Sequence, residues 1–249
     1  MPEIPLEAFL ILEVIVLAAS TAVGITSFGF GTIMSPLFLI FLDSNLVVEL
    51  NVALFAILMI TVSYQSRNDI DKSLILIVTV AALTMIPLGT LVVKILDNQS
   101  LRFLIIGVVL VMAILPISRL RHKFKREKVV AIPLGAILGF LYSSVALGGP
   151  IFVLFALNQG WGKKRTRANL SALFAIVGIL VLIYHAFSGL YGTSELIVTA
   201  LFIPPLALGS IIASRLIHHV NERIFRVAVY IVLFSSSIGI LAKEVYLIL

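Results

Sequence analysis

The sequence contains no cysteine, which excludes disulfides, thiolate metal ligands, cysteine nucleophiles and lipid attachment through sulfur. Charged residues are also scarce: Asp, Glu, Lys and Arg make up 12% of the 249 residues, against about 25% in soluble domains. Such a chain has too few polar groups to cover a soluble fold, and its 61% apolar residues exclude disorder. The composition therefore predicts an all-α, polytopic membrane protein.

Stretches without a charged residue indicate where the chain crosses the membrane. Two of these runs, 14–42 and 129–162, have 29 and 34 residues and are too long for one helical span of about 20 residues. Each contains a glycine cluster, Gly24–Gly31 in the first and Gly139–Pro150 in the second. We therefore expect each long run to form two helical pieces joined at glycine by non-helical backbone. Six further runs fit one span each: 50–66, 73–93, 103–118, 168–194, 196–214 and 227–242.

The lengths of the runs indicate an internal duplication. Runs of 29, 17, 21 and 16 residues are followed by runs of 34, 27, 19 and 16, so the overlong run comes first in each set. The segment that begins at Asn51 also resembles the segment that begins at Asn169. The sequence thus predicts two repeats of about five helical segments each. The first transmembrane repeat is 1–118, the basic linker is 119–128 and the second repeat is 129–249.

The positions of the charges predict that the two repeats are inverted. Each repeat makes five crossings if its broken run spans twice, or three if that run is re-entrant, and either odd number requires opposite orientations. The expected loop at 43–49 has acidic residues only, whereas its counterpart at 163–167 is Lys-Lys-Arg-Thr-Arg. Because basic residues collect on the cytoplasmic side, we expect a cell-membrane protein with a cytoplasmic linker and both termini outside.

Inverted repeats with broken helices are typical of secondary transporters, whose substrates bind between the repeats. A helix that restarts inside the membrane presents N–H groups without intrahelical partners and a partial charge of about +0.5, so it can bind an anion without a buried lysine. Close helix packing is the alternative role for each single glycine. The candidate substrate-binding residues of the two clusters are Thr26, Ser27, Gly29, Phe30, Gly31, Thr32, Ser143, Ser144, Gly148, Gly149 and Pro150.

Four polar residues near helix ends are further candidates. Asn51 and Asn169 occupy matching positions, where they form either a polar substrate-binding pair or helix caps and interhelical hydrogen bonds. Arg167 is a candidate for the entrance of the pathway, with positive-inside anchoring as its alternative. Gln65 is a candidate gating residue, with helix capping as its alternative.

Two titratable residues are candidates for proton coupling. Glu13 is the deepest carboxylate by its place in the runs, and an acid inside a membrane is a functional candidate. His185 ends a run, and histidine is the residue type that most readily exchanges protons near neutral pH. For both residues a position at the membrane interface is the alternative. No metal site is expected, because the adjacent His218 and His219 point apart on a helix.

At the two glycine clusters the sequence resembles the sulfite exporter TauE/SafE family, also called TSUP. The first matching feature is Gly29-Phe-Gly31 followed by Pro36, and the second is Gly148-Gly-Pro150 followed by Trp161 and a basic stretch. The length, the duplicated layout and the basic linker are similar too, so the resemblance covers nearly the whole chain. It implies a secondary carrier that exports or takes up sulfite, sulfoacetate or related sulfonates.

Together with the inverted repeats, this resemblance predicts alternating access coupled to an ion gradient, without enzymatic activity and without a cofactor. The expected partners are a small anionic substrate and membrane lipid, with no nucleic acid, and a homodimer stays open. One alternative is a divalent-metal permease, for which the runs offer only Glu13 as a carboxylate. The other is a membrane-embedded enzyme, although motifs such as His-Glu-x-x-His and Gly-x-Ser-x-Gly are missing from the sequence.

Overall fold

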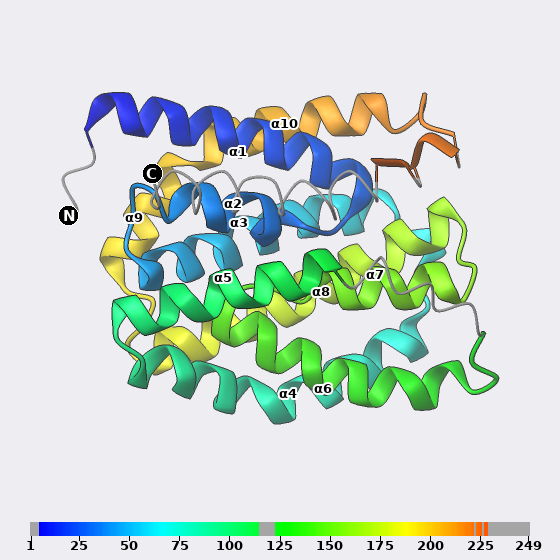
Figure 1. Cartoon of the computed structure of the whole chain (residues 1–249). Helices are drawn as coiled ribbons and strands as arrows, with labels where there is room; N and C mark the ends of the chain where they lie inside the picture. The colour runs from blue at the N-terminus through cyan, green and yellow to red at the C-terminus, as the bar shows by residue number, and fades with distance from the viewer. Residues whose placement is uncertain (1–4, 115–122, 222, 226, 229–249) are drawn as a thin grey trace.

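The computed structural model describes residues 5–114, 123–221, 223–225 and 227–228, and this part of the chain is helical without strands. The helices lie side by side along one axis, with α1 and α10 on one side, α4 and α6 on the other, and α3 and α8 between them (Figure 1). Among the described residues, five helices are long and apolar enough to cross a membrane: α1 (Leu6–Thr26), α3 (Ser44–Gln65), α4 (Lys72–Ile95), α6 (Glu127–Val145) and α8 (Lys163–Phe187). The other elements are α2 (Phe30–Phe38), η1 (Arg67–Asp69), α5 (Asn98–Ile114), α7 (Gly149–Asn158), α9 (Thr193–Leu201) and α10 (Ile203–Leu216).

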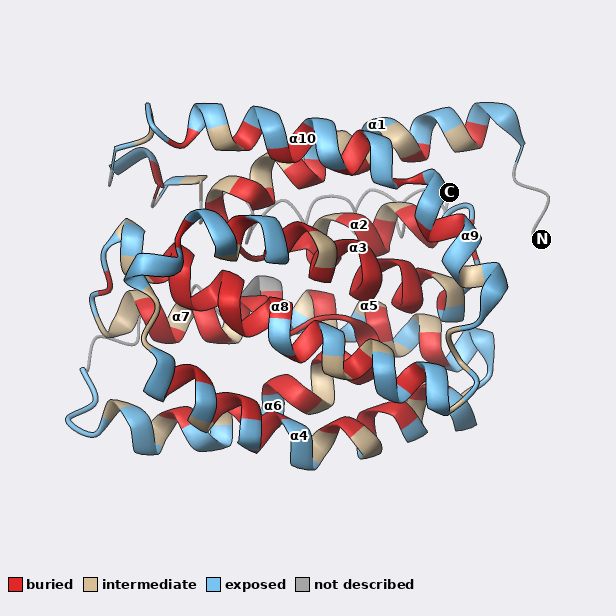
Figure 2. Ribbon diagram, turned by 180° about the vertical axis from the view of Figure 1, so that it is seen from behind, coloured by how far each residue is buried: buried red, intermediate tan, exposed pale blue. Residues whose placement is uncertain are grey.

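The distribution of apolar side chains is that of a membrane protein. The central helices α3 and α8 are mostly buried, whereas the outer helices are exposed along their outward faces (Figure 2). The residues on these outward faces include large apolar side chains. In water such faces would be unstable, but lipid solvates them. The prediction of an all-α polytopic membrane protein is therefore confirmed. The exposed residues include Leu10, Ile11 and Val14 on α1, Leu76, Val80 and Leu83 on α4, and Leu208, Ile211 and Ile212 on α10.

The first long run forms a hairpin of α1 and α2, which we call the first hairpin. Its chain turns at Ser27 and Gly29, which have φ angles of 63° and 89°. Phe9, near the start of α1, and Phe38, at the end of α2, both pack against the ring of Phe202, at centroid distances of 5.4 and 5.6 Å. Helix α2 thus returns to the end of the bundle at which α1 begins.

The second long run forms a corresponding hairpin of α6 and α7, the second hairpin. Its turn contains Ala146 in the left-handed region, with φ 57°. Gln159, just after α7, exchanges two hydrogen bonds with the backbone of Phe124, just before α6, at 2.8 and 3.2 Å. The indole of Trp161 also donates to Glu127, at 2.6 Å. Helix α7 thus returns to the end at which α6 begins.

The two hairpins enter the bundle from opposite ends. Helices α3 and α8 are antiparallel, because the start of α8 contacts the end of α3 through Arg167 and Gln65. Helix α6 begins beside the start of α8, where Arg165 lies 3.1 Å from Glu127, whereas the first hairpin leads directly into the start of α3. We call the end where α6 and α8 begin the linker end, and the other the distal end.

Two expectations from the charge-free runs are wrong in detail. Helix α3 begins at Ser44, so 43–49 is not a loop, and Glu49 lies inside the helix with 1% of its surface exposed. A charged residue does not mark the end of a helix when a partner inside the bundle pairs with it. The run 196–214 is not one straight span either, because α9 and α10 meet at 47° beside Pro204 and Pro205, which lack N–H donors. The run 227–242 and linker residues 119–122 lie outside the described residues, apart from positions 227 and 228.

Candidate functional site

The tips of the two hairpins touch each other between the ends of the bundle. A Cβ atom on Gly31 would lie 2.5 Å from the carbonyl oxygen of Ala146, and one on Gly149 would lie 3.2 Å from the backbone nitrogen of Gly29 and from Cβ of Phe28. Real Cβ atoms do not approach a backbone oxygen at 2.5 Å, so the first contact requires glycine. The two glycine clusters predicted to face each other are therefore brought together.

A small cavity of about 10 Å³ lies between the tips, with room for about one water molecule. It is bordered by the first residues of both α2 and α7, where helix N–H groups lack intrahelical partners and the helix dipoles place partial positive charge. Helix α7 offers one donor fewer, because Pro150 has no N–H. The lining residues are Gly29, Phe30, Gly31, Thr32, Phe55, Tyr142, Ala146, Leu147, Gly148, Gly149, Pro150 and Phe174.

Aromatic rings close this cavity. Phe55 stacks on Phe30 at 5.7 Å and packs against Phe174 at 4.9 Å, and Tyr142 packs edge-on against Phe174 at 5.6 Å. The hydroxyl of Tyr142 is fully buried and has no hydrogen-bond partner among the described residues. A buried hydroxyl without a partner costs about 1–3 kcal/mol, so it points to a water molecule or a ligand in the cavity.

Most of the predicted hydroxyl ligands are engaged elsewhere. Thr26, Thr32, Ser143 and Ser144 each donate to a backbone carbonyl of their own helix or turn, at 2.7–3.1 Å. Ser27, at the turn of the first hairpin, is buried, and its hydroxyl has no partner within the described residues. Ser27 is therefore the hydroxyl of this set that can donate to a substrate without breaking an existing bond.

The two matching asparagines do not face each other. The amide of Asn51 donates to the hydroxyl of Ser35 on α2, at 2.9 Å. Asn169 accepts from the backbone N–H of Asp71 at 2.8 Å and donates to the carbonyl of Arg165 at 3.0 Å. Both side chains thus make the interhelical or local hydrogen bonds that the sequence left open as their alternative role.

The two gating candidates lie together beside the first hairpin. Arg167 is 7% exposed; its guanidinium donates to the side chain of Gln65 at 2.8 Å and, through two longer contacts, to the carbonyl oxygen of Gly24 in the last turn of α1. A cation is stabilised at a helix C-terminus. However, no carboxylate in the described part of the chain pairs with Arg167, and a guanidinium has five N–H donors. Donors of a buried cation therefore remain for an anion.

A second buried charged group occupies the equivalent place beside the second hairpin. Nδ1 of His185 lies 2.8 Å from Oε1 of Glu49, and Nε2 lies 3.0 Å from the carbonyl oxygen of Ser143. Gly24 and Ser143 each precede the left-handed residue of their hairpin by three positions. The sequence did not single out Glu49. Glu49 precedes Asn51 by two residues, as Arg167 precedes Asn169. This equal spacing is the feature of the sequence that indicates Glu49 as the counterpart of Arg167.

Glu13 is not the deepest carboxylate, because Glu49 is almost completely buried whereas Glu13 is partly exposed. Glu13 precedes the end of α1 by 13 residues, or about 20 Å along the helix axis. It is therefore remote from the place where the hairpins meet, and the structure does not bring it together with His185, the other candidate for proton coupling.

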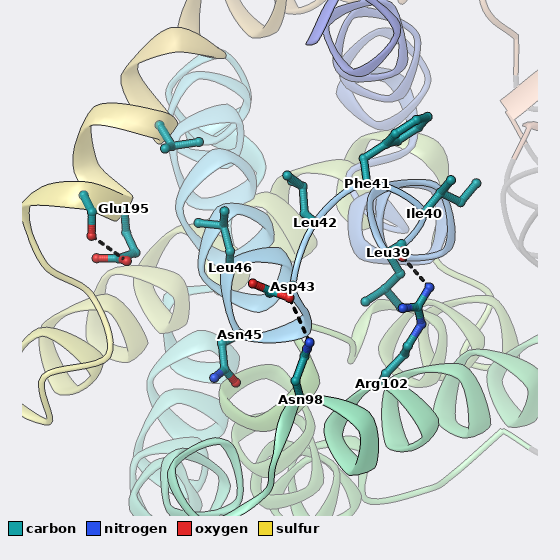
Figure 3. Close-up of a pocket in the computed structure, with 12 residues that line it drawn as sticks. Leu39, Ile40, Phe41, Leu42, Asp43, Asn45, Leu46, Asn98, Arg102 and Glu195 are labelled. Atoms are coloured by element: carbon teal, nitrogen blue, oxygen red, sulfur yellow. Dashed lines mark hydrogen bonds between the residues drawn. The ribbon is translucent and has the colours of Figure 1, made fainter. Parts of the chain in front are cut away.

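A larger cavity, of about 740 Å³, lies at the distal end (Figure 3). Asp43 accepts a hydrogen bond from Asn98 at 2.8 Å, Arg102 donates to the carbonyl of Leu39, and Glu195 lies across the cavity from them. In the adjoining α8–α9 loop, burial raises the pKa of the Tyr191 phenol above its ordinary value. The cavity thus combines polar groups of both signs at the end that also holds Glu49 and His185.

Comparison with known protein families shows to which family the chain belongs. The family model for sulfite exporter TauE/SafE matches residues 12–240 of the chain. The chain belongs to the TauE/SafE family. The match includes both hairpins and the central helices of this TauE/SafE protein, so the family predicted from the glycine clusters is confirmed, and the chain is a membrane transport protein. Neither the curated proteins nor the solved structures give a match to this TauE/SafE chain.

Proposed function

We propose that this TauE/SafE protein is a secondary carrier of a small sulfur-containing or organic anion, such as sulfite, sulfoacetate or a related sulfonate. Transport across the cell membrane proceeds by alternating access and is coupled to an ion gradient. The observation that carries this proposal is Arg167, a buried cation without a carboxylate partner among the described residues, which is held beside the first hairpin.

The chemistry around the hairpin tips suits an oxyanion. The starts of α2 and α7 offer N–H donors and partial positive charge, and the cavity between them is lined without any carboxylate in the described part of the chain. Tyr142 and Ser27 supply buried hydroxyls that have no hydrogen-bond partner among the described residues. A guanidinium forms paired, charge-assisted hydrogen bonds to planar or tetrahedral oxyanions, so Arg167 favours a sulfonate or sulfite over a neutral solute.

The packing of the helices supports inverted repeats and alternating access. Helix α1 packs along α10, α6 packs along α4, and α3 packs against α8. These are the pairs expected if a two-fold axis between α3 and α8 relates 1–118 to 129–249. Two hairpins that enter from opposite ends and meet at their tips leave a closed cavity between them. Movement of one hairpin away from the other would open that cavity toward one end at a time.

The charge distribution supports a cytoplasmic linker end, with the N- and C-termini outside. Basic residues of the described chain collect at the linker end, whereas Lys94 and Arg102 lie at the distal end. Positively charged loops stay in the cytoplasm during insertion. The basic residues at the linker end are Arg67, Lys72, Lys123, Lys125, Arg126, Lys128, Lys163, Lys164, Arg165 and Arg215.

Single cysteines in this cysteine-free chain test the orientation. Gly192 at the distal end and Lys125 at the linker end are both exposed. We expect Gly192→Cys to react with a membrane-impermeant maleimide added to intact cells, and Lys125→Cys to react only after the cells are opened. Labelling of Lys125→Cys in intact cells would contradict the proposed orientation.

Ligand binding by the purified protein in detergent tests the substrate class. We expect sulfite, sulfoacetate or another sulfonate to raise the melting temperature, because a ligand at 100 times its Kd stabilises the folded state by about 2.7 kcal/mol. The melting temperature is measured in parallel with Mn²⁺ and Zn²⁺, which a divalent-metal permease would bind. Product analysis after incubation with each anion tests whether the protein is an enzyme. Stabilisation by a divalent cation and by no small anion would contradict an anion carrier.

A further inference from the structure

The buried contact between Glu49 and His185 joins three helices that belong to different parts of the fold. Glu49 lies on α3 and His185 on α8, with 1% and 0% of their surfaces exposed. The ring of His185 also contacts the carbonyl of Ser143, in the last turn of α6. Binding of an anion at Arg167 does not use any of these groups, and a buried acid–base pair needs another reason to be inside a membrane protein.

The geometry determines how many protons the contact holds. A carbonyl oxygen can only accept, so the 3.0 Å contact to Ser143 places a hydrogen on Nε2 of His185. The 3.0 Å hydrogen bond between Nδ1 and Oε2 of Glu49 then needs one further hydrogen, either on Nδ1, as imidazolium and carboxylate, or on the carboxyl group. Both arrangements are neutral overall. Loss of that one proton leaves a buried negative charge and two facing lone pairs, which is strongly unfavourable.

The proton is linked to the position of the second hairpin. The carbonyl of Ser143 precedes the turn at Ala146 by three residues, and the carbonyl of Ala146 faces Gly31 at the tip of the first hairpin. The His185 ring therefore connects the tip of the second hairpin to Glu49 on α3. When the proton leaves, Glu49 and Nδ1 repel each other, and this connection is lost.

Within the described part of the chain, the surroundings of the pair supply no fixed counter-charge. Glu195 faces Glu49 from α9, and Tyr191 does so from the α8–α9 loop. Tyr142 lies on α6 near the pair, and its phenol stays neutral because tyrosine ionises at about pH 10. Asp43 and Arg102 line the distal cavity together with Glu195. Arg102 is engaged with the carbonyl of Leu39 rather than with Glu49.

We propose that the Glu49–His185 pair binds the proton that is carried together with the anion. This inference rests on the proposed anion transport. An anion between the hairpin tips is repelled by the deprotonated pair, which has a charge of −1, and is not repelled by the neutral, protonated pair. Binding of the anion and binding of the proton therefore favour each other, and the coupling is reciprocal. The result is symport of one proton with the anion.

At the first hairpin, the carbonyl that corresponds to that of Ser143 contacts a permanent charge and not a titratable one. This carbonyl, of Gly24, accepts from Arg167, which is permanently charged. One hairpin thus has a fixed cation that attracts the anion, and the other has a titratable pair. Anion binding at Arg167 and proton binding at the Glu49–His185 pair are thus separate. Variants of Arg167 can therefore be distinguished from variants of the pair.

Two assays on proteoliposomes that contain the full chain test the proposal. Exchange of labelled for unlabelled methanesulfonate at equal pH needs only the anion site, whereas accumulation driven by a pH difference also needs the coupled proton. Methanesulfonate has one permanent charge, so its own ionisation does not follow the gradient. With the inside about one pH unit more alkaline and no membrane potential, symport of one proton gives about tenfold accumulation.

We expect Glu49→Gln and His185→Gln to lose this accumulation, so that the internal concentration equals the external one, while exchange is still measurable. Asp97→Asn is the matched control at the distal end: its carboxylate is fully exposed and accepts hydrogen bonds from Ser100 and Gln99, which asparagine can also accept. Tenfold accumulation by Glu49→Gln would overturn the proposal. Absence of exchange in the wild-type protein for methanesulfonate, for sulfite and for every other small anion tested would overturn anion transport, and this inference with it.

If the variants fail to fold, proton uptake by the wild-type protein tests whether anion binding is coupled to proton binding. Addition of methanesulfonate to protein in weakly buffered detergent is expected to raise the pH of the solution by the equivalent of up to one proton per chain. The uptake depends on the starting pH and is largest where the pair is half protonated. Anion binding without proton uptake at every pH at which the protein is folded would overturn the proposal.

Discussion

Replacement of Arg167 by glutamine is expected to weaken anion binding by about 10- to 100-fold. Charge-assisted hydrogen bonds contribute about 1.5–3 kcal/mol, and each 1.4 kcal/mol corresponds to a factor of about ten in Kd. Glutamine can still donate to the carbonyl of Gly24, so the contact that Arg167 makes with α1 is partly kept. Lysine at this position keeps the charge but not the paired geometry of the guanidinium, and we expect an intermediate affinity.

Stability should change in the opposite direction from affinity. A buried charge without a counter-ion destabilises the folded state, so Arg167→Gln should unfold at the same temperature as the wild-type protein or at a higher one. Titration calorimetry and thermal unfolding on one preparation measure both quantities. Arg215→Gln is the matched control, because Arg215 lies exposed at the same end of the bundle. Wild-type affinity in Arg167→Gln would show that Arg167 is an anchor and not a ligand.

Gly31→Ala is expected to abolish transport and to reduce the free energy of unfolding by about 1–3 kcal/mol. The added methyl group would lie 2.5 Å from the carbonyl oxygen of Ala146. That atom belongs to the backbone of the opposite hairpin and cannot rotate away, so the two tips must separate. Because the tips are separated, the closed cavity between them cannot form, and alternating access requires this closed cavity.

Gly107→Ala provides the control for this prediction. Gly107 lies in the middle of α5, and a Cβ atom there would have no neighbour within 4 Å among the residues that the structure describes. Alanine is favoured over glycine in a helix by about 0.8–1 kcal/mol, so this variant should be at least as stable as the wild-type protein and should transport normally. Transport and unfolding should be measured for both variants in the same membranes. Wild-type behaviour of Gly31→Ala would contradict contact between the hairpin tips as the closed site.

The breaks in the two long helices could be predicted from the sequence because they leave a clear trace there. A run of 29 or 34 uncharged residues is too long for one span, and glycine stands where the helices end. Whether the broken runs cross the membrane or return could not be predicted, because both give an odd number of crossings. The aromatic contacts of Phe9 and Phe38 with Phe202 settle this as a return, and such contacts depend on packing between distant segments.

The candidate site could be predicted only in part. The residues at the hairpin tips followed from the glycine clusters, whereas Glu49 was missed because charged residues were taken to mark helix ends. That rule fails when the charge has a partner 136 positions away, as Glu49 has in His185. The hydroxyls of Ser143 and Ser144 also looked available, but serines in a helix often donate to the preceding turn, as these two do.

Counterflow of labelled sulfite in proteoliposomes is the direct test of anion transport by alternating access, because exchange requires an anion site that opens alternately to both sides. We expect rapid exchange by the wild-type protein and by Arg215→Gln. At a sulfite concentration below Kd, exchange by Arg167→Gln should fall by about 10- to 100-fold, in proportion to the loss of affinity. Absence of exchange by the wild-type protein for sulfite and for every sulfonate and small organic anion tested, or equal exchange by Arg167→Gln, would contradict alternating-access transport of an anion bound at Arg167.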